Sequence, residues 1–148
     1  MSLNQRDVVI VGMARTAIGN INGDLSGKTA VELGIVAGKA ALERSGVTPE
    51  QIDEVVTGNV YKAGLKGNPA RQIQLALGIP VEAGAVTVEQ QCASGMRALE
   101  IGTQQIKLGK TDISLICGIE SMSNVPYYDM RTRTGSRLGS YQMEDGLL

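Results

Sequence analysis

The chain has 148 residues, of which 43% are hydrophobic and 20% are charged, proportions typical of one globular domain with a hydrophobic core. Its formal net charge of −1 argues against nucleic-acid or membrane binding through a positively charged surface. Because the sequence has neither a run of about 18 apolar residues nor an apolar leader, we expect a cytoplasmic protein with reduced cysteines.

The elements expected in the first part of the chain alternate between strands and helices. The apolar run at residues 7–12 predicts a first strand that is buried on both faces. A helix is expected over residues 29–46, because Thr29 and Glu32 have capping-box spacing and Gly46 suits the position after a helix. A second strand is expected near residues 54–60.

The same alternation continues in the second part of the chain. Asn68, Pro69 and Gly78 mark the start and the end of a second helix. A third strand is expected at residues 83–88, a third helix at 94–109 and a fourth strand at 112–118. The order β-α-β-α-β-α-β predicts an α/β fold with a mostly parallel sheet and helices on both faces.

Cys92 lies between the third expected strand and the third expected helix. Sites in open parallel sheets gather beyond the carboxyl ends of the strands, and a helix N-terminus offers free N–H groups. Such groups favour the thiolate, which is the nucleophilic form of cysteine, and can also bind an oxyanion. Ala93, Ser94 and Gly95 leave room for a bulky acyl donor. The position fits a nucleophile, although free cysteine is also often a buried hydrophobic residue.

Other reactive and charged residues give weaker signals. Cys117 lies inside an apolar strand, where a buried and inert thiol is expected. Arg131, Arg133 and Arg137 fit an exposed face or a subunit contact better than a phosphate site. Glu89 is expected to face solvent. The chain contains no histidine and therefore lacks the commonest general base and metal ligand.

Four stretches together resemble the thiolase family, in particular the N-terminal part of its acetyl-CoA acetyltransferases. They resemble, in order, the family's opening strand and loop, its second strand with an Asn-Pro-Ala-Arg helix, its nucleophilic cysteine signature and the segment that leaves the sheet. The stretches read "VVIVGMARTAIGNINGDLS", "IDEVVTGNVYKAGLKGNPARQIQLALGIP", "QQCASGMRALEIG" and "GIESMSNVPYYDMRTRTGSRLG". Their order and spacing match the family from one end of the chain to the other.

This resemblance implies a thiolase-like α/β domain over residues 1–120 that lacks its last strand. Residues 121–148 would begin a loop domain that takes part in tetramerisation. A sheet without its last strand should leave an edge and an apolar helix face uncovered.

The implied activity is the reversible condensation of two acetyl-CoA to acetoacetyl-CoA and CoA, or thiolysis of a 3-ketoacyl-CoA, in lipid metabolism. Cys92 would carry the acyl group, and its backbone N–H would supply half of an oxyanion hole. Leu147 would pack near the pantetheine arm of CoA. The resemblance implies acyl-CoA thioesters as substrates, no further cofactor, no metal and a homo-oligomer, either a dimer or a tetramer.

The chain departs from the family's pattern around the cysteine and in its length. The family usually has Asn two or three residues before the cysteine, where this chain has Glu89, Gln90 and Gln91, and it commonly has Gly in place of Cys117. Its histidines, its active-site Asn and its second cysteine lie in downstream segments that this chain lacks. Three hypotheses remain: part of an active thiolase, a half-fold subunit or fragment without catalysis of its own, or another condensing enzyme of the thiolase superfamily.

Overall fold

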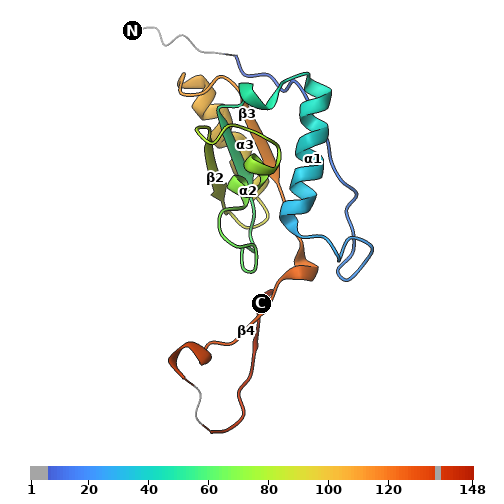
Figure 1. Ribbon diagram of the computed structural model, residues 1–148, viewed down its shortest axis with the longest axis vertical. Helices are drawn as coiled ribbons and strands as arrows, with labels where there is room; N and C mark the ends of the chain where they lie inside the picture. Colours follow the sequence, from blue (N-terminus) through green and yellow to red (C-terminus); the bar gives the residue numbers. More distant parts are fainter. Residues whose placement is uncertain (1–6, 136–137) are drawn as a thin grey trace.

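A three-stranded parallel sheet lies at the centre of the molecule, in a computed structural model that describes residues 7–135 and 138–148 (Figure 1). The strands are β1 (Glu54–Gly58), β2 (Gly84–Val88) and β3 (Ser114–Gly118). Their order is β2-β1-β3, and Val56 in the middle strand pairs with Val86 and Ile116. The expected parallel sheet is therefore confirmed.

Helices cover both faces of this sheet, as the sequence predicts. They are α1 (Ala30–Ser45), α2 (Pro69–Ala76) and α3 (Ser94–Lys107). On one face, the fully buried Val55 belongs to a core that α1 and α2 complete with Leu42 and Ile73. On the other face, a Cβ on Gly102 of α3 would lie 2.4 Å from Ile116, so this helix packs directly on the sheet.

The helix ends follow the sequence signals. The Thr29 hydroxyl accepts the Glu32 N–H at 3.2 Å, and the Glu32 carboxylate accepts the Thr29 N–H at 2.8 Å, so the capping box is formed. Asn68 caps α2 through the N–H groups of Ala70 and Arg71. Capping side chains satisfy backbone donors that have no partner within the helix, which is why these boundaries can be recognised in the sequence.

The first expected strand is not formed, so this part of the prediction is wrong for the structure. Residues 7–20 have no regular secondary structure, and Val9, Ile10 and Val11 are 60–73% exposed. The segment lies against α1, where the Arg44 guanidinium donates to the Met13 carbonyl oxygen at 2.9 Å (Figure 1). A strand requires a neighbour to satisfy its backbone groups, and β3 does not pair with this segment.

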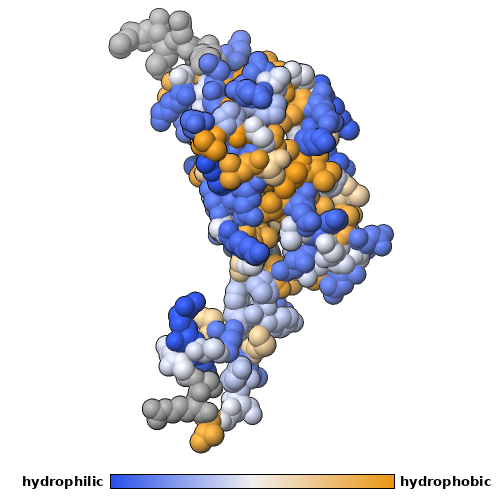
Figure 2. Space-filling view, in the orientation of Figure 1, coloured by the Kyte–Doolittle hydropathy of each residue, from blue (hydrophilic) through white to orange (hydrophobic). Residues whose placement is uncertain are grey.

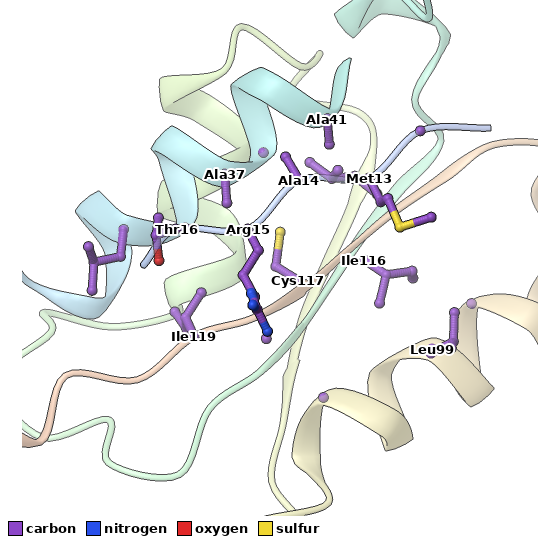
Figure 3. Close-up of a pocket in the computed structure, with 18 of the residues that line it drawn as sticks. Met13, Ala14, Arg15, Thr16, Ala37, Ala41, Leu99, Ile116, Cys117 and Ile119 are labelled. Carbon is purple, nitrogen blue, oxygen red and sulfur yellow. The ribbon is translucent and has the colours of Figure 1, made fainter. Parts of the chain in front are cut away.

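A large cavity, which we call the slot, separates this segment from β3 (Figure 3). Its volume is about 1460 Å³, and α1 and α3 form its other walls. In the part of the chain that the structure describes, no strand pairs with the slot side of β3. Small and apolar residues from all four elements line the slot, among them Ala14, Ala37, Ala41, Leu99, Ile116 and Ile119.

Residues 121–135 and 138–148 leave this body as a projecting arm (Figure 1). Two short strands, β4 (Tyr127–Tyr128) and β5 (Glu144–Asp145), pair antiparallel within it. At its base, the Asn124 side chain donates to the carbonyl oxygens of Ser26 and Lys28, both at 2.9 Å. Figure 2 shows hydrophobic side chains exposed on the body, whereas the arm is mostly hydrophilic or intermediate.

Candidate active site

The carboxyl ends of the three parallel strands place three loops side by side. The Asn59 N–H donates to the Val88 carbonyl oxygen at 3.1 Å, which joins the start of the loop after β1 to the last residue of β2. The Ile119 N–H donates to the Gly58 carbonyl oxygen at 3.0 Å, which joins the start of the loop after β3 to the last residue of β1. In parallel α/β sheets this edge is where ligands bind, so these loops form the candidate site.

Cys92 lies in the loop between β2 and α3, two residues before the helix begins, as the sequence predicts. It is exposed, so a ligand can reach its sulfur. The residue before it, Gln91, has a φ of 49°. This value lies in the left-handed region, which residues other than glycine rarely adopt. The chain therefore makes a sharp turn directly before the thiol.

The helix that follows Cys92 lies unusually close to the sheet. A Cβ on Gly58 would lie 2.4 Å from the carbonyl carbon and oxygen of Ser94. A Cβ on Gly95 would lie 3.7 Å from the Gly118 α-carbon. Because glycine occupies the ends of β1 and β3, the first turn of α3 rests on the backbone of both strands and places Cys92 at the edge of the sheet.

The loop after β1 is held by Glu120, a residue that we did not identify from the sequence. The Glu120 carboxylate accepts the N–H groups of Val60 at 2.9 Å and Tyr61 at 3.2 Å. It also accepts the Asn59 side-chain amide at 2.7 Å. Asn59 is 1% exposed, and its amide oxygen has no partner among the described residues. Partners about sixty positions apart leave no spacing pattern in one sequence, so only the folded chain reveals this network.

Glu89, three residues before Cys92, is exposed as expected. Its carboxylate lies 3.9 Å from the Lys62 ammonium and accepts the Gln91 N–H at 3.4 Å. Both charged side chains are about two-fifths exposed, so their attraction is largely screened by solvent. The pair still links the loop that carries Cys92 to the loop that Glu120 holds.

The structure also brings Leu147 to this side of the molecule. The Tyr61 hydroxyl donates to the Leu147 carbonyl oxygen at 3.3 Å, although the two residues are far apart in the sequence. Leu147 is half-buried beside the loop that follows β1. Its position is therefore compatible with contact to a ligand that reaches this edge of the sheet.

Cys117 has the buried environment that its sequence context predicts. It is 8% exposed in β3, at the wall of the slot rather than beside Cys92 (Figure 3). Burial raises the pKa of the Cys117 thiol to about 11. Because the thiol stays protonated near neutral pH, it is a poor nucleophile.

Other candidate features contribute no further group to the site. Arg131 and Arg133 are exposed on the arm, and Arg137 lies outside the described residues. Within residues 7–135 and 138–148, no three His, Cys, Asp or Glu side chains come together as a metal site. Over the same ranges, no helix combines the length and apolar character needed to cross a membrane.

Comparisons with known proteins agree with this geometry. The family model described as "Thiolase, N-terminal domain" matches residues 8–148. The cytosolic acetyl-CoA acetyltransferase of Gibberella zeae is 48% identical over 98% of this chain and 37% of its own length. The structure of an acetyl-CoA acetyltransferase from Syntrophomonas wolfei is 48% identical, with a TM-score of 0.90 over 95% of this chain and 35% of that one.

A thiolase from Ascaris suum, solved in complex with coenzyme A, is 40% identical. Its TM-score is 0.91 over 97% of this chain and 37% of that structure. This chain thus spans little more than a third of the length of the relatives that it matches.

Proposed function

This chain belongs to the thiolase family by its N-terminal domain, and we propose that the protein that contains it is an acyltransferase with Cys92 as nucleophile. Its substrates would be acyl-CoA thioesters, and its reaction the condensation of two acetyl-CoA to acetoacetyl-CoA and CoA, or the reverse thiolysis. Relatives named acetyl-CoA acetyltransferase and a relative solved with coenzyme A support this proposal. No cofactor beyond the CoA thioesters is part of it.

The proposed reaction has two steps that share the sulfur of Cys92. In the first, the Cys92 thiolate attacks the thioester carbonyl carbon, and the bond from that carbon to the CoA sulfur breaks, so CoA leaves as a thiolate. In the second, the enolate carbon of another acetyl-CoA attacks the acyl-enzyme carbonyl. A C–C bond forms, the bond to Cys92 breaks and its thiolate is regenerated. The backbone N–H of Cys92 is proposed to bind the oxyanion in the acylation step.

The position of Cys92 is the observation that carries the proposal. An exposed thiol follows a sharp turn at the carboxyl edge of a parallel sheet, two residues before a 14-residue helix. The helix N-terminus favours negative charge nearby, both on a thiolate and on the oxygen of a tetrahedral intermediate. Cys117 offers the opposite environment, because burial keeps its thiol protonated.

The proposed reaction needs proton transfer, for which this chain offers no histidine. Forming an enolate requires a base at the substrate α-carbon, and the chain has no histidine. We propose that the base comes from the part of the protein that corresponds to the remaining length of the relatives. A thiol at a helix N-terminus can be acylated without that base, so acylation and condensation are separable steps.

The slot supports the proposal that this domain is one part of a larger fold. Its volume of about 1460 Å³ exceeds that of ordinary small-molecule pockets, which are about 300–1,000 Å³. One wall is the unpaired side of β3, whose backbone groups require hydrogen bonds. We propose that a strand from the remaining part of the protein fills the slot and completes the domain at residues 1–120.

The arm at residues 121–148 is the proposed contact with other subunits. Tyr127, Met130 and Met143 are 57–74% exposed on it, and aromatic and methionine side chains are enriched in subunit interfaces. We propose a homo-oligomer, a dimer or a tetramer, in which the arm is covered. Leu147, at the return of the arm, is proposed to contact the pantetheine part of CoA. One relative is named as cytosolic, which supports the proposed cytoplasmic location. A role in lipid metabolism is part of the same proposal.

The test compares two cysteine variants in the native protein that contains this chain. Cys92→Ala should abolish thiolysis of acetoacetyl-CoA, measured from the loss of substrate absorbance, because no sulfur remains to carry the acyl group. Cys117→Ala is the matched control and should retain activity. If Cys92→Ala retains the activity of the unchanged protein, the proposed function is wrong.

Two alternatives predict different results in the same assay. A half-fold subunit or fragment without catalysis of its own would show no turnover even in the unchanged native protein. Another condensing enzyme of the thiolase superfamily would form an acyl-enzyme on Cys92 but would prefer an acyl donor other than acetyl-CoA.

A further inference from the structure

Gln91 has a backbone conformation that its side chain disfavours. Its φ of 49° lies in the left-handed region, where the Cβ of an L-residue comes too close to the following carbonyl oxygen. Such a conformation persists only where surrounding contacts hold it. The residue directly precedes Cys92, so the contacts that hold Gln91 also determine how the thiol projects from the loop.

One buried hydroxyl contacts backbone groups of both Gln90 and Gln91. Ser94 is 4% exposed, and its hydroxyl oxygen accepts the Gln90 N–H at 2.8 Å. The same hydroxyl donates to the Gln91 carbonyl oxygen at 2.6 Å. It therefore uses its single proton and one lone pair to close the turn around Gln91.

Backbone hydrogen bonds complete this closed turn. The Ala93 N–H donates to the Gln90 carbonyl oxygen at 3.0 Å, and the Ser94 N–H donates to the Gln91 carbonyl oxygen at 3.0 Å. Without the hydroxyl, the Gln91 carbonyl would keep one donor, while the Gln90 N–H would lose its acceptor. The side chain of Ser94 thus adds a constraint that its backbone cannot supply.

Ser94 is itself fixed against the sheet. A Cβ on Gly58 would lie only 2.4 Å from the Ser94 carbonyl group, so the end of β1 blocks movement of the helix start toward the sheet. The turn is held by Ser94, and Ser94 is held by β1. This arrangement connects the rigid sheet to the exposed thiol through one short series of contacts.

We infer that Ser94 is a positioning residue whose hydroxyl holds Gln91 in the left-handed conformation and thereby sets the direction of the Cys92 thiol. The inference rests on the proposed function in taking Cys92 as the reacting group. Ser94 itself touches neither substrate nor the reacting atoms in this account. Its effect on the reaction passes through the backbone of the two residues before the cysteine.

The primary test is Ser94→Ala in the native protein that contains this chain. The rate constant for alkylation of Cys92 by iodoacetamide, followed by peptide mass spectrometry at fixed pH, should fall by about tenfold. In acyl transfer, kcat should fall by about 10- to 100-fold with KM little changed, because a displacement of about 1 Å at a reacting group has effects of this size.

Ser45→Ala is the matched control. The Ser45 hydroxyl donates to the Leu42 carbonyl oxygen at 2.8 Å and accepts the Val47 N–H at 3.1 Å, which is the same pair of contacts. Ser45 is the last residue of α1 and lies near the start of β3, at the amino ends of the strands, whereas Cys92 lies at their carboxyl ends. This variant should lower stability but leave the alkylation rate unchanged. Equal alkylation rates for Ser94→Ala and Ser45→Ala would overturn the inference.

Substitutions at Gln91 test the conformation directly. Glycine adopts a positive φ without steric cost, so Gln91→Gly should reduce the effect of Ser94→Ala on alkylation from about tenfold to about threefold or less. Gln91→Val should slow alkylation several-fold, because β-branched residues disfavour this conformation. Gln91 is exposed, so Gln91→Val should fold even if Ser94→Ala does not. An unchanged alkylation rate in Gln91→Val would then contradict the inference.

The alkylation assay separates this inference from the proposed function. If Cys92→Ala remains active while Ser94→Ala still slows alkylation of Cys92, the proposed function fails and the positioning role of Ser94 stands. If Cys92→Ala is inactive while Ser94→Ala alkylates at the unchanged rate, the function stands and the positioning role fails.

Discussion

Burial distinguishes the two thiols of this chain more clearly than sequence context does. Cys117 is enclosed in β3, and burial raises its pKa from 9.0 to about 11. Cys92 is exposed before α3. Iodoacetamide at about pH 8 should therefore alkylate Cys92 and leave Cys117 unmodified in the folded protein. Peptide mass spectrometry measures both sites in one sample, and equal labelling under native conditions would contradict the burial of Cys117.

The same burial predicts how stability changes in alkaline solution. Between 9.0 and about 11, the unfolded state loses the Cys117 proton while the folded state keeps it. The unfolded state then binds fewer protons, so the free energy of unfolding should fall as pH rises through this window. Urea unfolding of Cys117→Ala should show a shallower fall than unfolding of Cys92→Ala. Parallel curves for the two variants would show that Cys117 does not contribute.

The Glu120 side chain provides the hydrogen-bond acceptor for backbone N–H groups in the loop after β1. Its carboxylate accepts three N–H groups, two from the backbone and one from Asn59. In Glu120→Gln, an amide NH₂ would face at least one of these donors, so the free energy of unfolding should fall by about 1–3 kcal/mol. Urea unfolding measures the change, with the exposed Glu43→Gln as control. The expectation fails if both substitutions are neutral.

Close packing of α3 on the sheet depends on glycine at the end of β1. Gly58→Ala would place a Cβ 2.4 Å from Ser94, so the first turn of α3 must move away from β1. We expect a loss of about 1–3 kcal/mol in stability, typical of overpacking, and a slower alkylation of Cys92. Gly27→Ala is the control, because a Cβ there meets no atom within 4 Å. Unchanged stability and thiol reactivity in Gly58→Ala would disprove the close contact.

The two long-range connections of Asn68 make it more than a helix cap. Besides capping α2, its side chain accepts the Thr87 hydroxyl at 2.6 Å and donates to the Ala85 carbonyl oxygen at 3.0 Å, so it joins α2 to β2. Thr29 caps α1 within its own helix. Thr29→Ala should cost about 1 kcal/mol, and Asn68→Ala more. Thermal unfolding of both variants measures the two losses of stability. A larger loss in Thr29→Ala than in Asn68→Ala would contradict the prediction.

An element of this fold is predictable from the sequence when residues close to it in the chain define it. Helices α1 and α2 carry their own caps, so their boundaries are recognisable without the rest of the fold. The run at residues 7–12 has the composition of a buried strand, but a strand also needs a partner, and composition does not show whether one is present. The placement of Cys92 between a strand and a helix was predictable, because strand, cysteine and helix are consecutive in the sequence. Its supports were not found, because the left-handed φ of Gln91 and the Asn59–Glu120 contact arise only in the folded chain.

The slot makes a prediction about the whole protein. The Asp53 N–H donates to the Ile113 carbonyl oxygen, and the Ile119 N–H donates to the Gly58 carbonyl oxygen. The backbone N–H and C=O groups of the odd-numbered residues of β3 therefore point toward β1. By alternation, the N–H groups of Ile116 and Gly118 face the slot.

In the isolated 148-residue chain, hydrogen exchange at Ile116 and Gly118 should be faster than at Leu115 and Cys117. In the native protein that contains the chain, all four amides should be protected, because the proposed strand fills the slot. Fast exchange at Ile116 and Gly118 in the native protein would show that the slot stays open.

The proposed site is divided between this domain and the rest of the protein, and this division affects how long the acyl-enzyme lasts. In the proposed function, this domain supplies the nucleophile and the loops that position it, and the base for enolate formation comes from the rest of the protein. An acyl group on Cys92 should therefore persist as long as no second acyl-CoA has been converted to the enolate that would attack it.

Trapping that acyl-enzyme is the most direct test of the account. The native protein that contains this chain would be mixed with acetyl-CoA, quenched in acid and digested, and each cysteine peptide would be weighed by mass spectrometry. The account predicts one acetyl group on the peptide that contains Cys92, none on the Cys117 peptide, and no acetyl group after Cys92→Ala. Acetyl-CoA turnover with an unmodified Cys92 peptide, or with acetyl on Cys117 instead, would contradict it.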